Sequence, residues 1–125
     1  MKILLADDDR TILTIAELSL SKLGGHEVVC ARDGREALEL AAREKPDLII
    51  LDAMMPGMDG YEACARLKAD PATSGIPVIF LTAAEPQEKE KALALGARGV
   101  IAKPFRPDLL PAQVRALLPG PGLSI

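Results

Sequence analysis

Five short apolar runs alternate with segments of helical spacing along the chain. The runs cover residues 2–6, 26–31, 47–51, 77–81 and 99–102. Runs that are apolar on both faces are typical of parallel strands that helices cover on both sides. A regular alternation of strand and helix favours right-handed crossovers, which place helices on both sides of the sheet. The pattern therefore predicts an α/β fold: a doubly wound, five-stranded parallel sheet in a three-layer sandwich.

The intervening helices have recognisable ends. We predict helices over residues 10–23 and 34–44, a third that begins after Asp59, a fourth that ends at Gly96 and a fifth that begins near Pro107. A Gly-Gly pair follows the first helix and a Lys-Pro step follows the second, and both are usual helix stops. Asp59 is a residue type that caps helix N-termini well.

The chain length of 125 residues predicts one domain, which we place over residues 1–118. Residues 119–125 hold two Pro-Gly pairs and no periodicity, so we interpret them as a flexible tail or a truncated linker. Cys30 and Cys64 lie in apolar surroundings without a secretion signal, and we expect both thiols to be reduced and buried. No apolar run approaches the ~20 residues of a membrane span, and we expect a cytoplasmic protein without membrane contact.

Composition argues against direct binding of nucleic acid. The net charge is −3, and the aromatic residues are one Tyr and two Phe, with no Trp. A basic patch and aromatic residues that stack on bases are therefore both lacking.

Polar residues capable of chemistry follow four of the five predicted strands. They are Asp7, Asp8 and Asp9 after the first strand, Asp52 after the third, Thr82 after the fourth and Lys103 after the fifth. Because parallel strands end at one edge of the sheet, these side chains are expected in a common crevice. Several carboxylates with one lysine need a cation, and hard oxygen ligands suit Mg²⁺.

The same residues suggest phosphoryl chemistry. An ionised Asp beside Mg²⁺ can attack a phosphoryl group and form an acyl phosphate. The metal, Lys103 and the Thr82 hydroxyl would then stabilise the phosphoryl oxygens. These considerations leave open which Asp is attacked.

Four segments in this order resemble the receiver domain of two-component response regulators. They are "ILLADDD", "DLIILDAMMPGMDGYE", "VIFLTAA" and "GARGVIAKPF". The resemblance runs from Lys2 to about Leu118. It implies a flavodoxin-like sheet with strand order 2-1-3-4-5.

The resemblance also implies a role for each site residue. Asp52 would be the phosphoacceptor, with Thr82 and Lys103 contacting the phosphoryl oxygens. Mg²⁺, with Mn²⁺ as a substitute, would bind Asp8, Asp52, the backbone carbonyl of Met54 and, through water, Asp7. Asp9 would belong to the N-cap region of the first helix, and the Lys103-Pro104 bond would be cis.

The expected partners follow from the same resemblance. A histidine kinase or phosphotransfer protein would donate the phosphoryl group. The output would be a contact with a downstream protein, an output domain of the same protein, or a phosphorylation-dependent dimer, made through the face of the fourth helix, fifth strand and fifth helix. Such a domain catalyses only its own phosphorylation and dephosphorylation, so we do not expect an enzyme. Val100 departs from the family, because many receivers carry Tyr or Phe there as part of the switch; Thr82 and the loop after it remain as switch elements.

Two alternatives stay open at this point. The segment "DDDRT" also fits D-x-D-x-T, which resembles the nucleophile motif of haloacid-dehalogenase-type phosphatases, with Asp7 attacked and Asp9 as acid and base. Asp108 is the only acidic residue after Lys103, so the late acidic motif of that class is missing. The other alternative is a receiver-like binding scaffold that works without phosphorylation. A trapped phosphoryl label would separate the readings: Asp52 favours the receiver and Asp7 the phosphatase.

Overall fold

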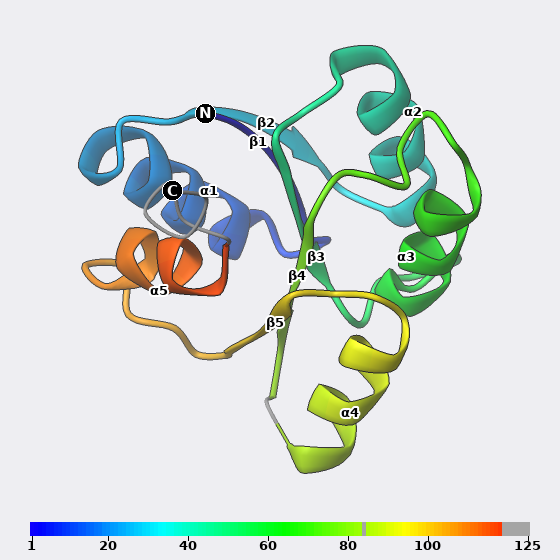
Figure 1. Ribbon diagram of the computed structural model, residues 1–125. Coiled ribbons are helices and arrows are strands. Elements are labelled where there is room, and N and C mark those ends of the chain that lie inside the picture. The colour runs from blue at the N-terminus through cyan, green and yellow to red at the C-terminus, as the bar shows by residue number, and fades with distance from the viewer. Residues whose placement is uncertain (84, 119–125) are drawn as a thin grey trace, which may run out of the picture.

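The computed structural model describes residues 1–83 and 85–118, which form a five-stranded sheet with helices on both faces (Figure 1). The strands are β1 (Lys2–Ala6), β2 (Glu27–Ala31), β3 (Leu48–Asp52), β4 (Val78–Thr82) and β5 (Gly99–Ala102). The helices are α1 (Arg10–Leu18), α2 (Gly34–Glu44), α3 (Gly60–Ala69), α4 (Pro86–Ala94) and α5 (Leu110–Leu117). All strand pairs are parallel and the order is β2-β1-β3-β4-β5, which confirms the predicted fold class and strand order.

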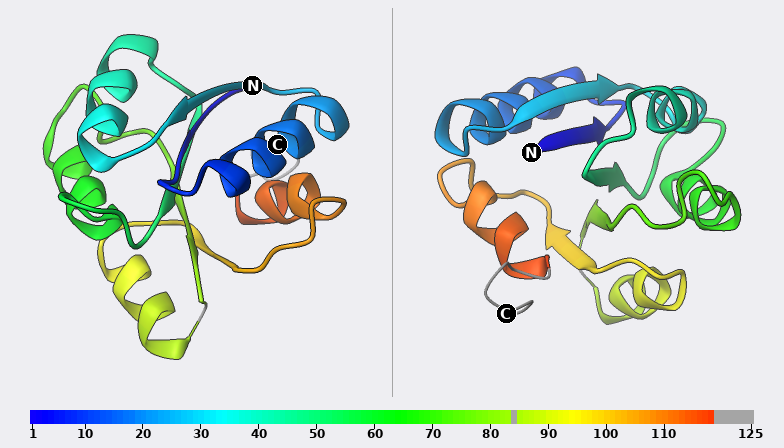
Figure 2. Two further views of the ribbon diagram at one scale, coloured as in Figure 1. Left: turned by 180° about the vertical axis from the view of Figure 1, so that it is seen from behind. Right: turned by 45° about the horizontal axis from the view of Figure 1, so that its top comes forward.

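The continuous apolar runs are explained by two helix layers. In β1, Ile3 and Leu5 pack with α1 and α5, whereas Leu4 and Ala6 pack with α2 and α3 on the opposite face. Figure 2 shows the sheet between these layers, with α1 and α5 on one side and α2, α3 and α4 on the other. The central strands β3 and β4 are buried at every position. Each large aliphatic side chain buried there contributes about 1.5–3 kcal/mol, so both faces stabilise the fold.

Two helix boundaries show how local chemistry modifies the predicted pattern. The first helix reaches Leu23 as predicted, but its last part, Ser19–Leu23, is a π-helix. The fifth helix begins at Leu110, later than predicted. The Leu110 N–H donates to the Arg106 carbonyl at 3.0 Å, but Pro111 has no N–H that could bond to the carbonyl of Pro107, so the regular series of helical hydrogen bonds is interrupted there. The Ser19 hydroxyl donates to this carbonyl instead.

The expectation for the two cysteines is confirmed for one of them and wrong in part for the other. Both cysteines are free; Cys64 is buried, but Cys30 is only half-buried. Burial and the nearby acids raise the pKa of the Cys30 thiol to about 11, so it stays protonated. Within residues 1–83 and 85–118, none of the helices combines the length and the hydropathy that a membrane span needs. The predicted tail, 119–125, lies outside the described residues.

Candidate functional site

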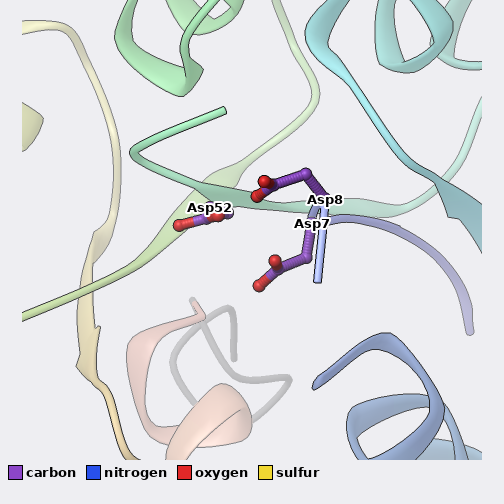
Figure 3. Close-up of side chains that lie close together, drawn as sticks. All are labelled: Asp7, Asp8 and Asp52. Atoms are coloured by element: carbon purple, nitrogen blue, oxygen red, sulfur yellow. The ribbon is translucent and has the colours of Figure 1, made fainter. Parts of the chain in front are cut away.

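Three carboxylates gather at the carboxyl edge of the sheet. Asp7 and Asp8 follow β1, and Asp52 is the last residue of β3 (Figure 3). One carboxylate oxygen from each residue lies within 4.8 Å of the others. The pairing of β1 with β3 produces this arrangement, because it sets Ala6 opposite Leu51 and ends both strands at the same level. Asp7 and Asp52 are buried, while Asp8 is exposed.

The turn after β1 separates the third acid from this cluster. Asp9 is the N-cap of α1: its Oδ1 accepts hydrogen bonds from the N–H groups of Thr11 at 2.9 Å and Ile12 at 3.2 Å. The Asp9 N–H in turn donates to Asp7 Oδ1 at 2.9 Å. Asp9 therefore stabilises the start of α1 and orients Asp7, as expected for its N-cap assignment.

A glycine at the start of α3 allows the backbone of Asp52 to lie where it does. A Cβ added to Gly60 would lie 2.1 Å from the carbonyl oxygen of Asp52, so only glycine fits at this contact. The Gly60 N–H donates to the Ala53 carbonyl at 2.9 Å. Next to it, Asp59 caps α3 by accepting from the Glu62 N–H at 2.8 Å. The Asp-Gly pair thus holds α3 directly against the end of β3.

Lys103 brings one positive charge to two buried carboxylates. Its Nζ lies 2.8 Å from Asp7 Oδ2 and 3.1 Å from Asp52 Oδ1. Its backbone N–H donates to the Thr82 carbonyl at 2.8 Å, which fastens the segment after β5 to the end of β4. The Lys103-Pro104 bond is cis, as expected.

Burial and charge shift the pKa values of Asp52 and Lys103. Burial is the largest influence on Asp52, and the charge of Asp7 adds to it; the Lys103 ammonium and the Met54 N–H act in the opposite direction. The result is a pKa of about 6 for Asp52. Burial lowers the pKa of Lys103, but the two carboxylates outweigh it and the net shift is upward. Lys103 therefore stays charged, and the folded protein destabilises the ionised form of Asp52.

The site carries more negative charge than Lys103 balances. Asp7 Oδ2 is buried and accepts no hydrogen bond of acceptable geometry. The Lys103 ammonium, 2.8 Å away, is its counter-charge. The three carboxylates offer only oxygen donors, the ligand type of Mg²⁺, Ca²⁺ and Mn²⁺. Ligand oxygens around an octahedral Mg²⁺ lie roughly 3–4 Å apart, as its bond lengths require, and the three carboxylate oxygens lie within 4.8 Å of one another, close to this spacing. These residues thus fit a hard divalent cation.

The remaining predicted residues divide between the site and the sheet interior. An open depression of about 430 Å³ is lined by Asp7, Asp8, Asp9, Ile12, Asp52, Met54, Thr82, Ala83 and Lys103. The Met54 side chain is exposed, and its N–H donates to Asp52 Oδ1 at 3.3 Å. Val100 does not line this depression: it lies half-buried in β5 and packs on the apolar cluster beneath α4. Sequence reasoning missed Ile12 and Gly60; the Asp-Gly pair before a helix was the available signal for the latter.

Comparison with known proteins gives a consistent result. The family model "Response regulator receiver domain" matches residues 3–115. The regulatory protein PhoP of Bacillus subtilis is 42% identical over 118 residues, which cover 94% of this chain and 48% of PhoP. The response regulator PleD of Caulobacter vibrioides is 42% identical over 117 residues, which cover 93% of this chain and 26% of PleD. The chain thus spans about half the length, or less, of these curated relatives.

A solved structure resembles the chain over nearly its whole length. The chemotaxis protein CheY4 of Vibrio cholerae superposes with a TM-score of 0.87 at 35% identity, and the match covers 94% of this chain and 98% of that one. The sequence likeness and the shared fold therefore extend over the same region.

Proposed function

This chain belongs to the response regulator receiver domain family, and we propose that it is a phosphorylation-dependent signalling switch in which Asp52 accepts the phosphoryl group. The observation that supports this most is the placement of Asp52 beside Asp7, Asp8 and the Lys103 ammonium at one sheet edge. A carboxylate among other carboxylates, with a single lysine, suits attack on an anionic phosphoryl group only when a cation offsets the charge.

The proposed metal is Mg²⁺, with Mn²⁺ as a substitute. Asp8, Asp52 and the backbone carbonyl of Met54 would hold it, and Asp7 would act through a bound water. When bound, the ion supplies positive charge that offsets the carboxylates and the incoming phosphoryl oxygens.

The side chains of this chain then divide the reaction between them. An Asp52 oxygen attacks phosphorus; the P–O bond forms as the bond to the donor's imidazole nitrogen breaks, and the imidazole leaves with the electron pair. Lys103 exchanges its contact with Asp52 for a phosphoryl oxygen, and the Thr82 hydroxyl donates to another. Asp7 retains Lys103 at the site, because their ion pair does not involve the atom that is phosphorylated.

A protein donor needs a docking surface, and an apolar groove adjoins the site. Ile12 and Lys103 line both the site depression and this groove, which continues past Ile15 and Pro107 to Leu23. Leu23 is 64% exposed and Ile15 is 39% exposed. Exposed apolar side chains in a row favour a protein contact. We infer that the histidine kinase or phosphotransfer protein packs here while it presents its phosphohistidine to Asp52.

The decisive test is the position of the phosphoryl group. We expect acetyl phosphate and Mg²⁺ to add one phosphoryl group that intact mass detects and that is labile in acid and in base. Borohydride trapping with peptide mapping should place it on Asp52. Asp52→Asn should abolish incorporation, whereas Asp33→Asn, which keeps a capping side chain on α2, should not. Trapping on Asp7 would favour the phosphatase alternative. That alternative also needs Asp9 as a free acid and base, whereas the Asp9 carboxylate accepts the capping bond of α1. No incorporation by a folded protein would favour the scaffold.

A second experiment tests the docking surface. Ile15→Glu should lower the rate of transfer from a phosphorylated donor protein at least about tenfold, the effect of losing a buried apolar anchor, and leave the acetyl phosphate reaction unchanged. Equal rates with the protein donor would exclude this surface. The output contact, dimerisation and a cytoplasmic location stay predictions.

A further inference from the structure

Helix α4 is held on the domain by little apolar packing. Among its residues only Ala92 is buried, Glu88 is half-buried, and the others are exposed. The N-cap residue, Glu85, makes no side-chain capping bond. Figure 1 shows α4 at the outer end of the layer that also contains α2 and α3. The position of α4 therefore depends on polar contacts more than that of the other helices.

Tyr61 of α3 supplies such contacts. Its ring is buried, with 6% exposure, and packs on Phe80 of β4 with ring centroids 5.0 Å apart. Its hydroxyl donates to Glu88 Oε2 on α4. The Lys91 ammonium, also on α4, lies 4.1 Å from the centroid of the same ring. One tyrosine thus binds two side chains of the neighbouring helix.

The three groups complement one another chemically. A buried phenol needs a hydrogen-bond partner, and a carboxylate acceptor makes a stronger bond than a neutral one. The ammonium interacts with the electron-rich face of the ring. We call Tyr61, Glu88 and Lys91 the Tyr61 clasp.

The clasp lies between the site and the surface of α4. Tyr61 follows Gly60, whose backbone contacts Asp52, and Phe80 belongs to the strand that ends at Thr82. Glu88 is in the first turn of α4, which begins shortly after Thr82 in the chain. Val100 packs on the same apolar cluster but has neither a ring nor a hydroxyl.

We propose that the Tyr61 clasp positions α4 in the unphosphorylated domain and opens when Asp52 is phosphorylated. The opening step rests on the proposed function: Thr82 moves toward the phosphoryl group and draws the first turn of α4 away from Tyr61. Tyr61 is then a positioning residue, and it couples the site to α4 where Val100 provides no ring.

The first experiment requires no phosphorylation. Tyr61→Phe and Glu88→Gln should each speed hydrogen exchange of the α4 amides at least about tenfold, because a hydrogen bond to a charged group is weakened or lost. The double variant should exchange no faster than Tyr61→Phe alone. Glu90→Gln, on the exposed side of α4, is the matched control and should exchange like the wild type. Unchanged α4 exchange in Tyr61→Phe would overturn the clasp.

The second experiment uses Tyr61 as its own reporter, since the chain has one Tyr and no Trp. A hydrogen-bonded carboxylate quenches phenol fluorescence, so emission should rise when acetyl phosphate and Mg²⁺ phosphorylate the wild type. In Glu88→Gln it should start higher and change little. Intact mass in the same samples reports incorporation. Full incorporation with unchanged emission and α4 exchange would refute the opening step and leave the proposed function standing. No incorporation would refute the proposed function and the opening step, while the first experiment still decides whether Tyr61 positions α4.

Discussion

Replacing Asp52 by Asn should stabilise the metal-free protein at neutral and alkaline pH. The folded state holds the Asp52 carboxylate in a buried place beside Asp7, and this raises its pKa from 3.8 to about 6. A difference of this size corresponds to roughly 3 kcal/mol at 1.36 kcal/mol for each pH unit. Such an amount is large beside the ~5–15 kcal/mol of a typical domain. Removing the charge should therefore raise the free energy of unfolding by a substantial part of this amount.

The pH dependence has a definite sign. A carboxyl group with a raised pKa binds its proton more tightly in the folded state, so the wild type loses stability as pH rises from 3.8 through about 6. Asp52→Asn does not titrate there. The free energy of unfolding of Asp52→Asn should exceed that of the wild type by about 0.5 kcal/mol near pH 4. This difference should grow between pH 4 and 6 and level off near 3 kcal/mol above pH 7.

Urea unfolding followed by far-UV circular dichroism, in EDTA at pH 4, 6 and 8, measures these differences. Asp33→Asn is the matched control, because Asn caps α2 as well as Asp does and the change should stay within about 0.5 kcal/mol. Adding Mg²⁺ at pH 8 should stabilise the wild type more than Asp52→Asn, since ligand binding to the folded state raises its stability. If Asp52→Asn in EDTA at pH 8 is no more stable than the wild type, the account of charge crowding is wrong.

Three further predictions concern stability. Gly60→Ala places a Cβ against the Asp52 carbonyl and should cost more than about 3 kcal/mol or prevent folding, whereas Gly75→Ala, where a Cβ meets nothing within 4 Å, should change the urea midpoint little. Lys103→Met removes the counter-charge of two buried carboxylates and should destabilise by roughly 3 kcal/mol at pH 8 and less at pH 5; equal losses at the two pH values would contradict this. Ser19→Ala removes the hydrogen bond that ties the π-helical segment Ser19–Leu23 to the turn before α5, and thermal unfolding should show a loss of about 1 kcal/mol.

The sequence by itself determined the features that depend on near neighbours. Runs such as residues 48–51 are apolar at every position, and this identifies strands covered on both faces. Asp9 and Asp59 cap the helices that begin directly after them, because a capping bond spans only two or three residues. The order of acids, threonine and lysine after successive strands indicated the candidate site, since parallel strands end at one edge.

Only the tertiary structure decided the features that depend on distant partners. The contact of Lys103 with both Asp7 and Asp52, and the raised pKa of Asp52, arise from strand packing and burial that no local pattern contains. The pairing of Tyr61 with Glu88 likewise joins two helices, and each residue alone resembles ordinary core or surface. Local periodicity reports which face of an element is apolar, whereas interaction energies between polar groups depend on ångström distances and on exclusion of water, which arise only when the elements pack together.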